Sequence, residues 1–284
     1  MGAGIITASV VSMGGIGAVL AAVLAVVDRK FHVTEDPRVE KITSILPGSN
    51  CGGCGHPGCR ALAEALLKGE EPPTACVAGG NDTAVKLAEV LGVEVGDTTR
   101  MIAVVLCRGG NAEAVRSAEY RGVLSCTAAD LTGGGKGCVY GCLGYGECVE
   151  ACNFNAMAMD DNGLPVVFHD MCVGCGAYVR ACPRDIIELH PEDHTLFVYC
   201  KNRDKGAKAK KVCKAACIAC GLCTKDCSVE GGIALKNNLA VVNFELAPQN
   251  DESTKRCPTK CILNGLEPKV TRKSFFSRLP KKAG

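Results

Sequence analysis

Closely spaced cysteines constrain this chain more than any other feature of its sequence. Twenty-one of its 284 residues are cysteine, none is tryptophan, and only 4% are aromatic. Because so few large side chains can build only a small core, bound metal is expected to help hold the fold together. Three interpretations of the cysteines compete: disulfides in an oxidising compartment, zinc sites, and iron–sulfur clusters.

The spacing of the cysteines separates these interpretations. Many are only two residues apart, which directs neighbouring thiolates at one small centre and argues against disulfides. Zinc sites usually join two separated cysteine pairs. Three cysteines at successive short spacings, with small residues between them, instead fit a bulky cubane that the backbone must wrap. We therefore expect iron–sulfur clusters in a reducing compartment.

The chain begins with a long uncharged segment. Residues 5–27 are 23 consecutive residues without a charged side chain, and as a helix at about 1.5 Å per residue they span about 35 Å, enough for a hydrocarbon core of about 30 Å. A signal peptide, the main alternative beside a buried helix, needs a basic segment and a shorter apolar run. Arg29 and Lys30 follow, so the positive-inside rule predicts a single-pass anchor in the cytoplasmic (inner) membrane with the cysteines facing the cytoplasm.

The first cysteine run follows a helix that the sequence predicts between Asp36-Pro37 and Pro47-Gly48. The run reads Cys51-x2-Cys54-x4-Cys59-x16-Cys76, with a second short helix predicted after Cys59. Glycines between the first three cysteines let the chain fold tightly around a cluster. We assign these four cysteines to one [4Fe–4S] site and expect the neighbouring His56 to be a loop residue.

A repeat of 75 residues organises the rest of the chain. The shift places the region from Cys138 on the region from Cys213 without insertion, and Cys182-Pro183 on Cys257-Pro258. The other cysteines that coincide are Cys142 with Cys217, Cys148 with Cys223, and Cys152 with Cys227. We interpret each copy as a two-half unit of the bacterial ferredoxin type.

The ferredoxin pattern predicts ligand sets, because the fourth cysteine of each run ligates the other cluster. One cluster is assigned to Cys138, Cys142, Cys148 and Cys182, with Cys138 replacing the ligand that is lost at Tyr145. Another is assigned to Cys217, Cys220, Cys223 and Cys257. Four cysteines fit no run and are candidates for one further cluster, the alternative being structural thiols: Cys107, Cys126, Cys200 and Cys213.

One half of the first copy lacks a ligand, because Tyr178 stands where the run beginning at Cys172 needs its third cysteine. The thiolates of Cys152, Cys172 and Cys175 could hold a [3Fe–4S] centre, or a cubane whose fourth iron takes another ligand. Complete loss of the cluster is the other alternative. A phenol with a pKa near 10 is a poor ligand, so we expect Tyr178 to pack against the site.

The matching half of the second copy has lost three thiolates. Ala247, Asn250 and Ser253 stand in their places, so we expect no cluster there and no ligand role for Cys227. Cys261 has no assigned role.

Other segments carry weaker signals. Residues 101–107 are predicted to form a buried strand and residues 111–120 a helix. The glycine-rich residues 133–137 lack the spacing of a phosphate loop, so no nucleotide site is expected. The histidines without companions are expected at the surface: His32, His169, His190 and His194. The formal charge of +2 gives no support for a nucleic-acid partner.

The order of these modules resembles one family over nearly the whole chain. A membrane helix, the run CGGCGHPGC, the segment KGCVYGCLGYGECVEAC and tandem ferredoxin units are similar to the B subunit of the Rnf complex. The resemblance implies an electron-transfer subunit of an ion-translocating ferredoxin:NAD oxidoreductase, coupled to Na+ or H+ transport. It implies soluble ferredoxin as electron donor, other membrane and peripheral subunits as partners, and flavin and nicotinamide sites elsewhere. Tyr178 and residues 247–253 depart from the family pattern.

The predicted class is α+β, with a single transmembrane helix, a small helical [4Fe–4S] domain and tandem βαβ-like ferredoxin units that hold four or five clusters. The expected divisions are an anchor (1–30), the first cluster domain (31–95), a connecting segment (96–132), ferredoxin units (133–192 and 193–265, the second with one degenerate half-site) and a basic tail (266–284). Two other functions fit the same features: an Rsx-type complex that reduces a redox-sensing regulator, and a membrane-tethered iron–sulfur sensor or scaffold. No complete catalytic site is expected in this chain alone.

Overall fold

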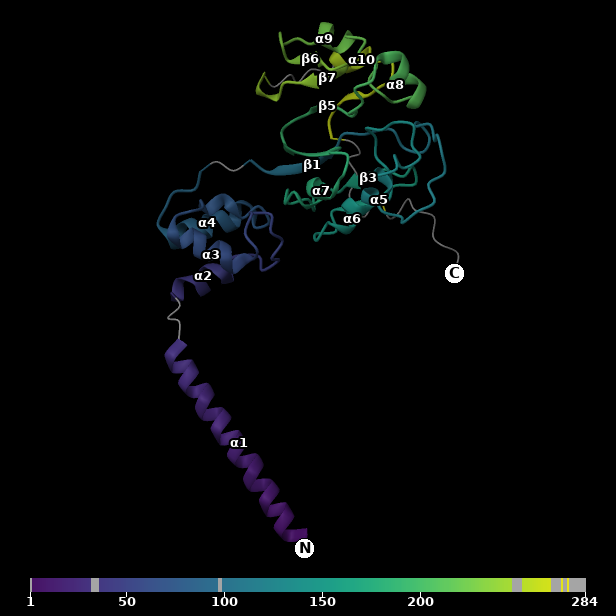
Figure 1. Cartoon of the computed structure of the whole chain (residues 1–284). Coiled ribbons are helices and arrows are strands. Elements are labelled where there is room, and N and C mark those ends of the chain that lie inside the picture. The colour runs from purple at the N-terminus through teal and green to yellow at the C-terminus, as the bar shows by residue number, and fades with distance from the viewer. Residues whose placement is uncertain are drawn as a thin grey trace.

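The computed structural model describes residues 2–31, 36–96, 99–246, 252–266, 272 and 275 (Figure 1). Helices and short strands are mixed, as the predicted α+β class requires. The α-helices are α1 (Gly2–Phe31), α2 (Pro37–Ile45), α3 (Cys59–Lys68), α4 (Gly80–Leu91), α5 (Cys126–Asp130), α6 (Glu147–Glu150), α7 (Ala177–Ala181), α8 (Gly206–Val212), α9 (Leu222–Asp226) and α10 (Glu252–Lys255). The 3-10 helices are η1 (Pro73–Ala75) and η2 (Phe244–Leu246). The strands are β1 (Met101–Val105), β2 (Met157–Met159), β3 (Pro165–Val167), β4 (Ile187–Pro191), β5 (Leu196–Val198), β6 (Ile233–Lys236), β7 (Leu239–Val242) and β8 (Ile262–Asn264).

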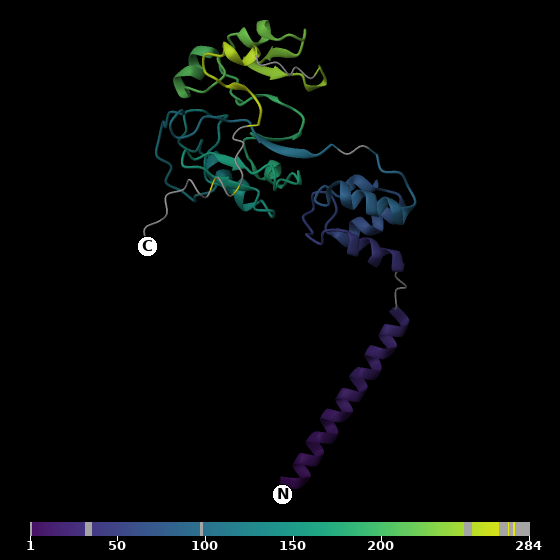
Figure 2. The same cartoon turned by 180° about the vertical axis from the view of Figure 1, so that it is seen from behind.

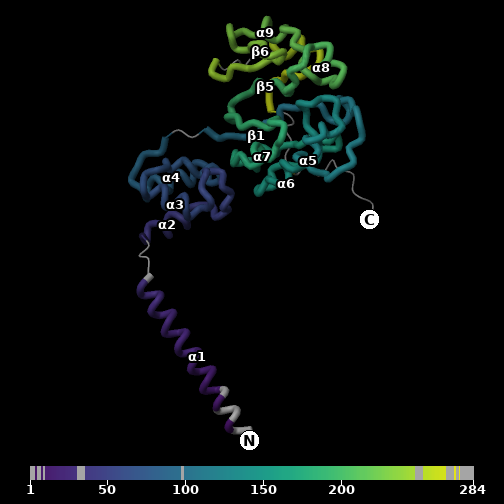
Figure 3. The backbone as a smooth tube through the Cα atoms, in the orientation of Figure 1, coloured from purple at the N-terminus to yellow at the C-terminus, as the bar shows by residue number. Residues whose placement is uncertain are grey.

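Helix α1 projects away from the rest of the molecule (Figures 1 and 3). Its segment Val10–Lys30 is long and apolar enough to cross a membrane, with a mean hydropathy of 2.5, and none of it is buried. The side chains of Val11 and Met13 are 73% and 75% exposed. Such a continuous exposed apolar surface is stable in lipid rather than in water, so α1 has the length and surface of the predicted anchor.

The module after α1 consists of α2, α3, α4 and η1, and its first two helices confirm the sequence prediction. Asp36 caps α2 by accepting a hydrogen bond from the backbone N–H of Arg38 at 2.9 Å. Helix α3 ends at Gly69, whose φ of 73° is the left-handed conformation that glycine adopts without strain. The apolar faces of the helices meet in one core, built from Ile42, Leu46, Leu62, Ala63, Leu66 and Leu87.

Two similarly built units follow, and their elements repeat the 75-residue shift. Helices α6 and α9 begin 75 positions apart, as do α7 and α10 and the strands β4 and β8. Each unit has an antiparallel hairpin, β2–β3 in the first and β6–β7 in the second. Strand β4 pairs with β1, and β8 pairs with β5. Over the described residues the strands thus form four separate two-stranded sheets.

The segment between the helical module and the first unit is part of that unit's fold. Strand β1 is confirmed, and its residues from Ile102 onward are buried. The helix predicted for residues 111–120 is wrong. Ala114 instead bridges Cys213 and Arg116 bridges Lys136, and the Val115 backbone N–H donates to the carbonyl of Val212 at 2.9 Å. This short segment lacks a helical apolar period, so long-range backbone pairing determines its conformation.

The second unit, with α8, α9 and α10, lies at the end of the molecule farthest from α1 in both views (Figures 1 and 2). Near the C-terminus, Phe275 returns to the first unit. Its ring packs edge-on against Phe168, with centroids 5.5 Å apart. The rest of the basic tail lies outside the described residues, apart from Leu266 and Arg272.

Candidate metal centres

The first cysteine run converges at one end of the helical module. The thiols of Cys54, Cys59 and Cys76 pack against the module's core, and Cys51 lies among them. Burial raises the pKa of Cys76, and the nearby charges of the other three thiolates raise it further. Asn50 fixes the start of α3, because its Oδ1 accepts a hydrogen bond from the Cys59 backbone N–H at 2.8 Å. We call this group the Cys51 site.

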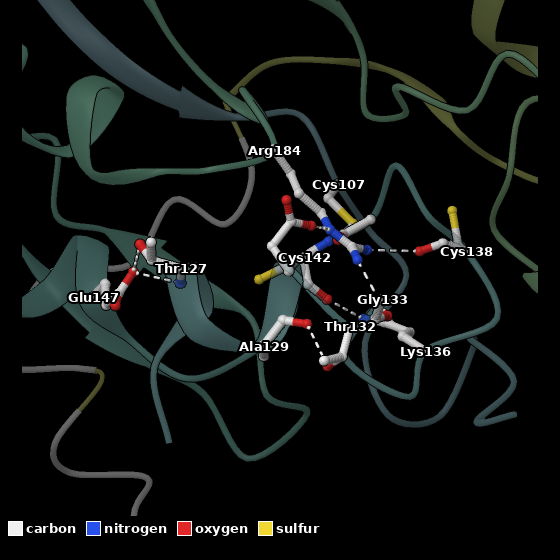
Figure 4. A network of polar contacts seen from close by, with 12 residues as sticks. Cys107, Thr127, Ala129, Thr132, Gly133, Lys136, Cys138, Cys142, Glu147 and Arg184 are labelled. Carbon is white, nitrogen blue, oxygen red and sulfur yellow. Dashed lines mark hydrogen bonds and ion pairs between the residues drawn. The ribbon is translucent and has the colours of Figure 1, made fainter. Parts of the chain in front are cut away.

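A second group of four cysteines lines a small cavity in the first unit. These are Cys126, Cys142, Cys148 and Cys182, and we call them the Cys126 site. The side chain of Glu147 holds α5 beside α6. Its carboxylate accepts hydrogen bonds from the Thr127 backbone N–H at 3.0 Å and from the Thr127 hydroxyl at 2.9 Å, and a third from Ser125 (Figure 4). Burial opposes ionisation of Glu147, but these hydrogen bonds lower its pKa.

Arg184 closes the other side of the Cys126 site. Its side chain is 5% exposed, and its guanidinium pairs with Asp130 at the end of α5 at 2.7 Å. It also donates to the carbonyls of Cys138 at 2.9 Å, Gly141 at 3.0 Å and Gly133 at 3.2 Å (Figure 4). One buried cation thereby ties the glycine-rich loop to the residues that precede Cys142.

The lysine of the glycine-rich loop also contacts backbone carbonyls. Lys136 donates to the carbonyls of Gly109 at 2.5 Å and Cys142 at 2.6 Å (Figure 4). Its ammonium is therefore engaged with backbone carbonyls and fixes the loop beside the cysteines.

A third group joins four cysteines that lie far apart in the sequence. Cys107, Cys138, Cys200 and Cys213 line one cavity, and we call them the Cys107 site. Asn202 lies at this site and is 1% exposed. Its amide donates to the Cys138 sulfur at 3.5 Å, and its backbone N–H donates to the Cys200 sulfur at 3.4 Å.

The structure thus exchanges two cysteines relative to the sets expected from sequence. Cys138 was grouped with Cys142, and Cys126 with Cys107, whereas the cavities place Cys126 beside Cys142 and Cys138 beside Cys107. The repeat contained a signal for this exchange. Cys138 coincides with Cys213 under the 75-residue shift. Cys213 stands outside a cysteine run that is already complete without it. By this equivalence, Cys138 also belongs outside the run that begins at Cys142.

The fourth group lies in the second unit and agrees with the expected set. Cys217, Cys220, Cys223 and Cys257 line one cavity together with Cys261, and we call the first four the Cys217 site. Cys261 is 3% exposed, and its sulfur lies 3.8 Å from that of Cys257. Hydrogen bonding to Cys261 lowers the pKa of Cys257 to about 4 and that of Cys217 to about 6.

Tyr178 fills the remaining half-site of the first unit. Its ring is 1% exposed and packs with Cys152 and Cys172 in the core of the unit. The Tyr178 hydroxyl lies 3.2 Å from the Cys172 sulfur. Burial raises the pKa of Tyr178, and the neighbouring charge of Cys172 raises it further, so the phenol stays protonated. We call these residues, with Cys175, the Tyr178 half-site.

The counterpart half-site in the second unit is described only in part. Ala247 and Asn250 lie outside the described residues, whereas Ser253 is buried at 1% exposure. Cys227 packs against the core of the second unit.

The histidines play no part in these groups. His56 lies 3.3 Å from Glu71, in agreement with a loop role. His32 lies outside the described residues. The surface position expected for His190 is wrong, because it is 8% exposed and packs edge-on against Phe197 with centroids 5.1 Å apart. The sequence from His190 onward, HPEDHTLF, does not alternate polar and apolar residues regularly. It therefore gave no indication that the His190 side chain of β4 points inward.

The chemistry of the donor sets fits iron–sulfur clusters. Burial raises the pKa of Cys148 to about 12, of Cys200 to about 12 and of Cys223 to about 11. Such thiols ionise only when a bound cation compensates the charge. Over the described residues, no three His, Cys, Asp or Glu side chains are arranged to hold a single metal ion. Thiols that line the walls of a cavity suit a larger group with several irons.

Comparison with known proteins agrees with the first of these sites. The family described as "Putative Fe-S cluster" matches residues 46–78, which contain the whole Cys51 site.

Three full-length relatives match most of the chain. It is 41% identical to the B subunit of the Na(+)-translocating ferredoxin:NAD(+) oxidoreductase complex of Acetobacterium woodii, over 90% of this chain and 77% of that protein. It is 40% identical to the B subunit of the proton-translocating complex of Clostridium ljungdahlii, over 89% and 91%. The B subunit of the ion-translocating oxidoreductase complex of Methanosarcina acetivorans is 35% identical, over 89% and 96%.

Proposed function

The chain belongs to the family of B subunits of ion-translocating ferredoxin:NAD oxidoreductase (Rnf-type) complexes, and from this premise we propose that it is the membrane-anchored electron relay of such a complex. It receives electrons from soluble ferredoxin on the cytoplasmic side and passes them to other subunits. The chemistry that takes up NAD belongs to those subunits, because the chain's own conspicuous groups are thiols rather than an acid–base constellation.

The relay has four cluster sites, each with four cysteines, in tandem ferredoxin units preceded by a helical cluster domain. Bound at the Cys51, Cys126, Cys107 and Cys217 sites, [4Fe–4S] clusters would supply one-electron carriers. The cavities of the last three sites support one common kind of occupant, since each is lined by at least four cysteines. The buried, high-pKa thiols support an occupant that carries positive charge.

The main support for the proposed relay is a pair of hydrogen bonds between neighbouring sites. The backbone N–H of Cys142, in the Cys126 site, donates to the sulfur of Cys107 at 3.4 Å. The backbone N–H of Cys217 donates to the sulfur of Cys200 at 3.3 Å. The Cys107 site is therefore joined to a neighbour on each side, which supports a continuous path through the two units.

The Tyr178 half-site bridges this path and the Cys51 site. Gly53 lies so close to Cys175 that a Cβ at Gly53 would come within 2.9 Å of the Cys175 Cβ. We infer that the half-site holds no cluster. Ligand atoms bound to different irons of a cubane are kept apart by the cubane between them. The Tyr178 hydroxyl instead touches the Cys172 sulfur. Electrons then pass between the Cys51 and Cys126 sites through packed protein, without a cluster at the half-site.

Helix α1 anchors the relay, with its C-terminal end on the cytoplasmic side. The support is its exposed apolar surface together with Arg29 and Lys30 in its last turn.

The Cys107 site provides the test, because it links the two units. Cys107→Ala in the assembled complex should leave the other three sites reducible by methyl viologen radical, as EPR would show, yet reduce ferredoxin-dependent NAD reduction at least about tenfold. Cys227→Ala is the matched control and should change neither. Unimpaired electron transfer in the Cys107→Ala complex would refute the relay through this site.

A further inference from the structure

Outside the basic tail, positive charge is concentrated in a segment that the relay does not explain. Residues 201–214 contain seven cationic side chains and one acidic side chain, a net charge of +6 in a chain whose total is +2, which leaves −4 for the other residues. The cationic residues are Lys201, Arg203, Lys205, Lys208, Lys210, Lys211 and Lys214. Their density is far above that of the chain as a whole.

Most of these cations point into solvent without a partner. Lys201 is half-buried and pairs with Glu188, and Lys208 pairs with Asp204 at 2.8 Å. The remaining five are exposed, and among the described residues none of them forms an ion pair: Arg203, Lys205, Lys210, Lys211 and Lys214. We call these five residues the basic surface. Five unneutralised cations on one short segment produce a strong local positive potential.

The basic surface lies directly over two of the cluster sites. Its segment begins directly after Cys200, and Cys213, the C-cap of α8, lies next to its last residue, so two cysteines of the Cys107 site lie near its two ends. The N-terminal end of α8 abuts the Cys217 site, because Gly206 packs on the Ile218 carbonyl so closely that a side chain there would collide with it. Cys220 of that site is itself exposed.

The position in the molecule distinguishes a protein partner from a lipid surface. Helix α8 lies at the end of the molecule away from α1 in both views (Figures 1 and 2). A membrane that holds α1 is therefore remote from the basic surface, whereas a soluble protein can reach it.

We propose that the basic surface is the docking site for the soluble electron carrier, and that this carrier is an acidic protein. The proposal rests on the function proposed above, which requires a soluble donor. Opposite charges accelerate encounter and orient the partner, and a small polar contact suffices because redox encounters are brief. One electron leaves the reduced carrier and one enters the chain at the Cys107 or Cys217 site.

The test compares two triple charge reversals in the full-length chain. Lys205→Glu, Lys210→Glu and Lys211→Glu remove the basic surface. Lys41→Glu, Lys68→Glu and Lys86→Glu change the net charge equally on exposed positions of the helical module. The probe is an oxidised bacterial ferredoxin of net negative charge, and its dissociation constant is measured at low and physiological ionic strength.

The α8 triple variant should bind the probe at least about tenfold more weakly at low salt and lose most of the salt dependence. The control triple variant should bind as the wild type does. Equal binding by the α8 variant, or equal weakening by the control, would overturn the proposal. So would a variant that loses only its affinity for anionic phospholipid vesicles, since that outcome assigns the surface to lipid.

Reduction by methyl viologen radical separates this proposal from the relay itself. Because the viologen is a small molecule that needs no docking surface, it should reduce wild type and both variants to the same final extent. If it reduces none of them, the cluster assignment fails independently of docking. Iron content equal to that of the wild type shows that the α8 variant is correctly folded.

Discussion

At position 178 a phenol occupies the place of a thiolate, and its surroundings show how the chain accommodates the change. The ring is buried and its hydroxyl contacts the Cys172 sulfur. Sequence alone left three outcomes open for this half-site, because a cysteine pattern states which ligand is lost and cannot state whether the replacing side chain fills the space. The packing of the ring favours loss of the cluster.

Tyr178→Cys should restore the ligand set and raise the iron content of the anaerobically reconstituted protein by about four atoms per chain. Tyr178→Ala creates a similar cavity without a thiolate and should add none. Loss of the ring from a filled core costs about 3–5 kcal/mol, so the alanine variant should also unfold at lower denaturant concentration. An unchanged iron content in the cysteine variant would contradict this account of the half-site.

Asn202 should tune the potential of the Cys107 site. Its amide donates to the Cys138 sulfur, and such hydrogen bonds stabilise the more negative, reduced state. Asn202→Ala removes a hydrogen bond worth about 1 kcal/mol, which for a one-electron couple lowers the potential by about 40 mV. Redox titration followed by EPR measures the shift. Ser44→Ala, at an exposed position of α2, should leave every potential unchanged.

The exchange of Cys126 and Cys138 shows which cysteine groupings the sequence could not predict. Spacing groups cysteines that share one run, and the structure brings the cysteines of the Cys51 and Cys217 sites together as grouped. Spacing does not identify ligands brought from separate segments, because these depend on how β1, α5 and α8 pack. Here the repeat related Cys138 to Cys213, and that relation was the better guide.

Among the secondary-structure elements, those with local signals were predictable. A capping aspartate before proline marked α2, and a continuous apolar run marked β1. Residues 111–120 lack both kinds of signal, and their backbone pairs with residues near 136 and 213. Local propensity is a weak guide where long-range pairing decides the conformation.

The turn after β3 should make the first unit sensitive to mild acid through His169. Burial lowers the pKa of His169, and the nearby Arg100 cation also lowers it, against the opposing charge of the Glu192 carboxylate. The folded state therefore favours the neutral ring, so its contribution to stability is present above the unfolded pKa of about 6.5 and is lost as the pH falls below that value.

His169→Gln should remove this dependence. Between pH 7.5 and pH 5.5 the wild type should lose about 2 °C more than the variant in the midpoint of thermal bleaching of its visible absorbance. The same midpoints measured for His56→Gln provide the control. A larger pH dependence in the His169→Gln variant would show that the sign is wrong.

For the whole molecule, the order of modules was the most predictive feature of the sequence. An apolar first helix, a complete cysteine run and an uninterrupted 75-residue shift together predicted an anchor followed by a helical module and two similar units. The contacts between these parts were not predictable, since they depend on single close approaches such as that of Gly53 to Cys175.

Deletion of residues 1–30 should release a soluble, brown protein. None of the membrane-spanning segment of α1 is buried, so its removal leaves the cores of the helical module and of both units intact. The released protein should keep the iron content of the full chain and elute as a monomer without detergent. If the truncated chain stays with the membrane in the absence of other subunits, α1 is not the anchor.

The central claim is that four sets of four cysteines each hold one cubane while the Tyr178 half-site holds none. Iron and acid-labile sulfide in the anaerobically purified full-length chain, measured together with EPR of the dithionite-reduced protein, test this claim most directly. We expect about sixteen irons and about sixteen sulfides per chain, four of each for every site, and no [3Fe–4S] signal after oxidation. About twelve irons or fewer in fully loaded protein, about twenty, or a [3Fe–4S] signal that Tyr178→Cys abolishes, would contradict it.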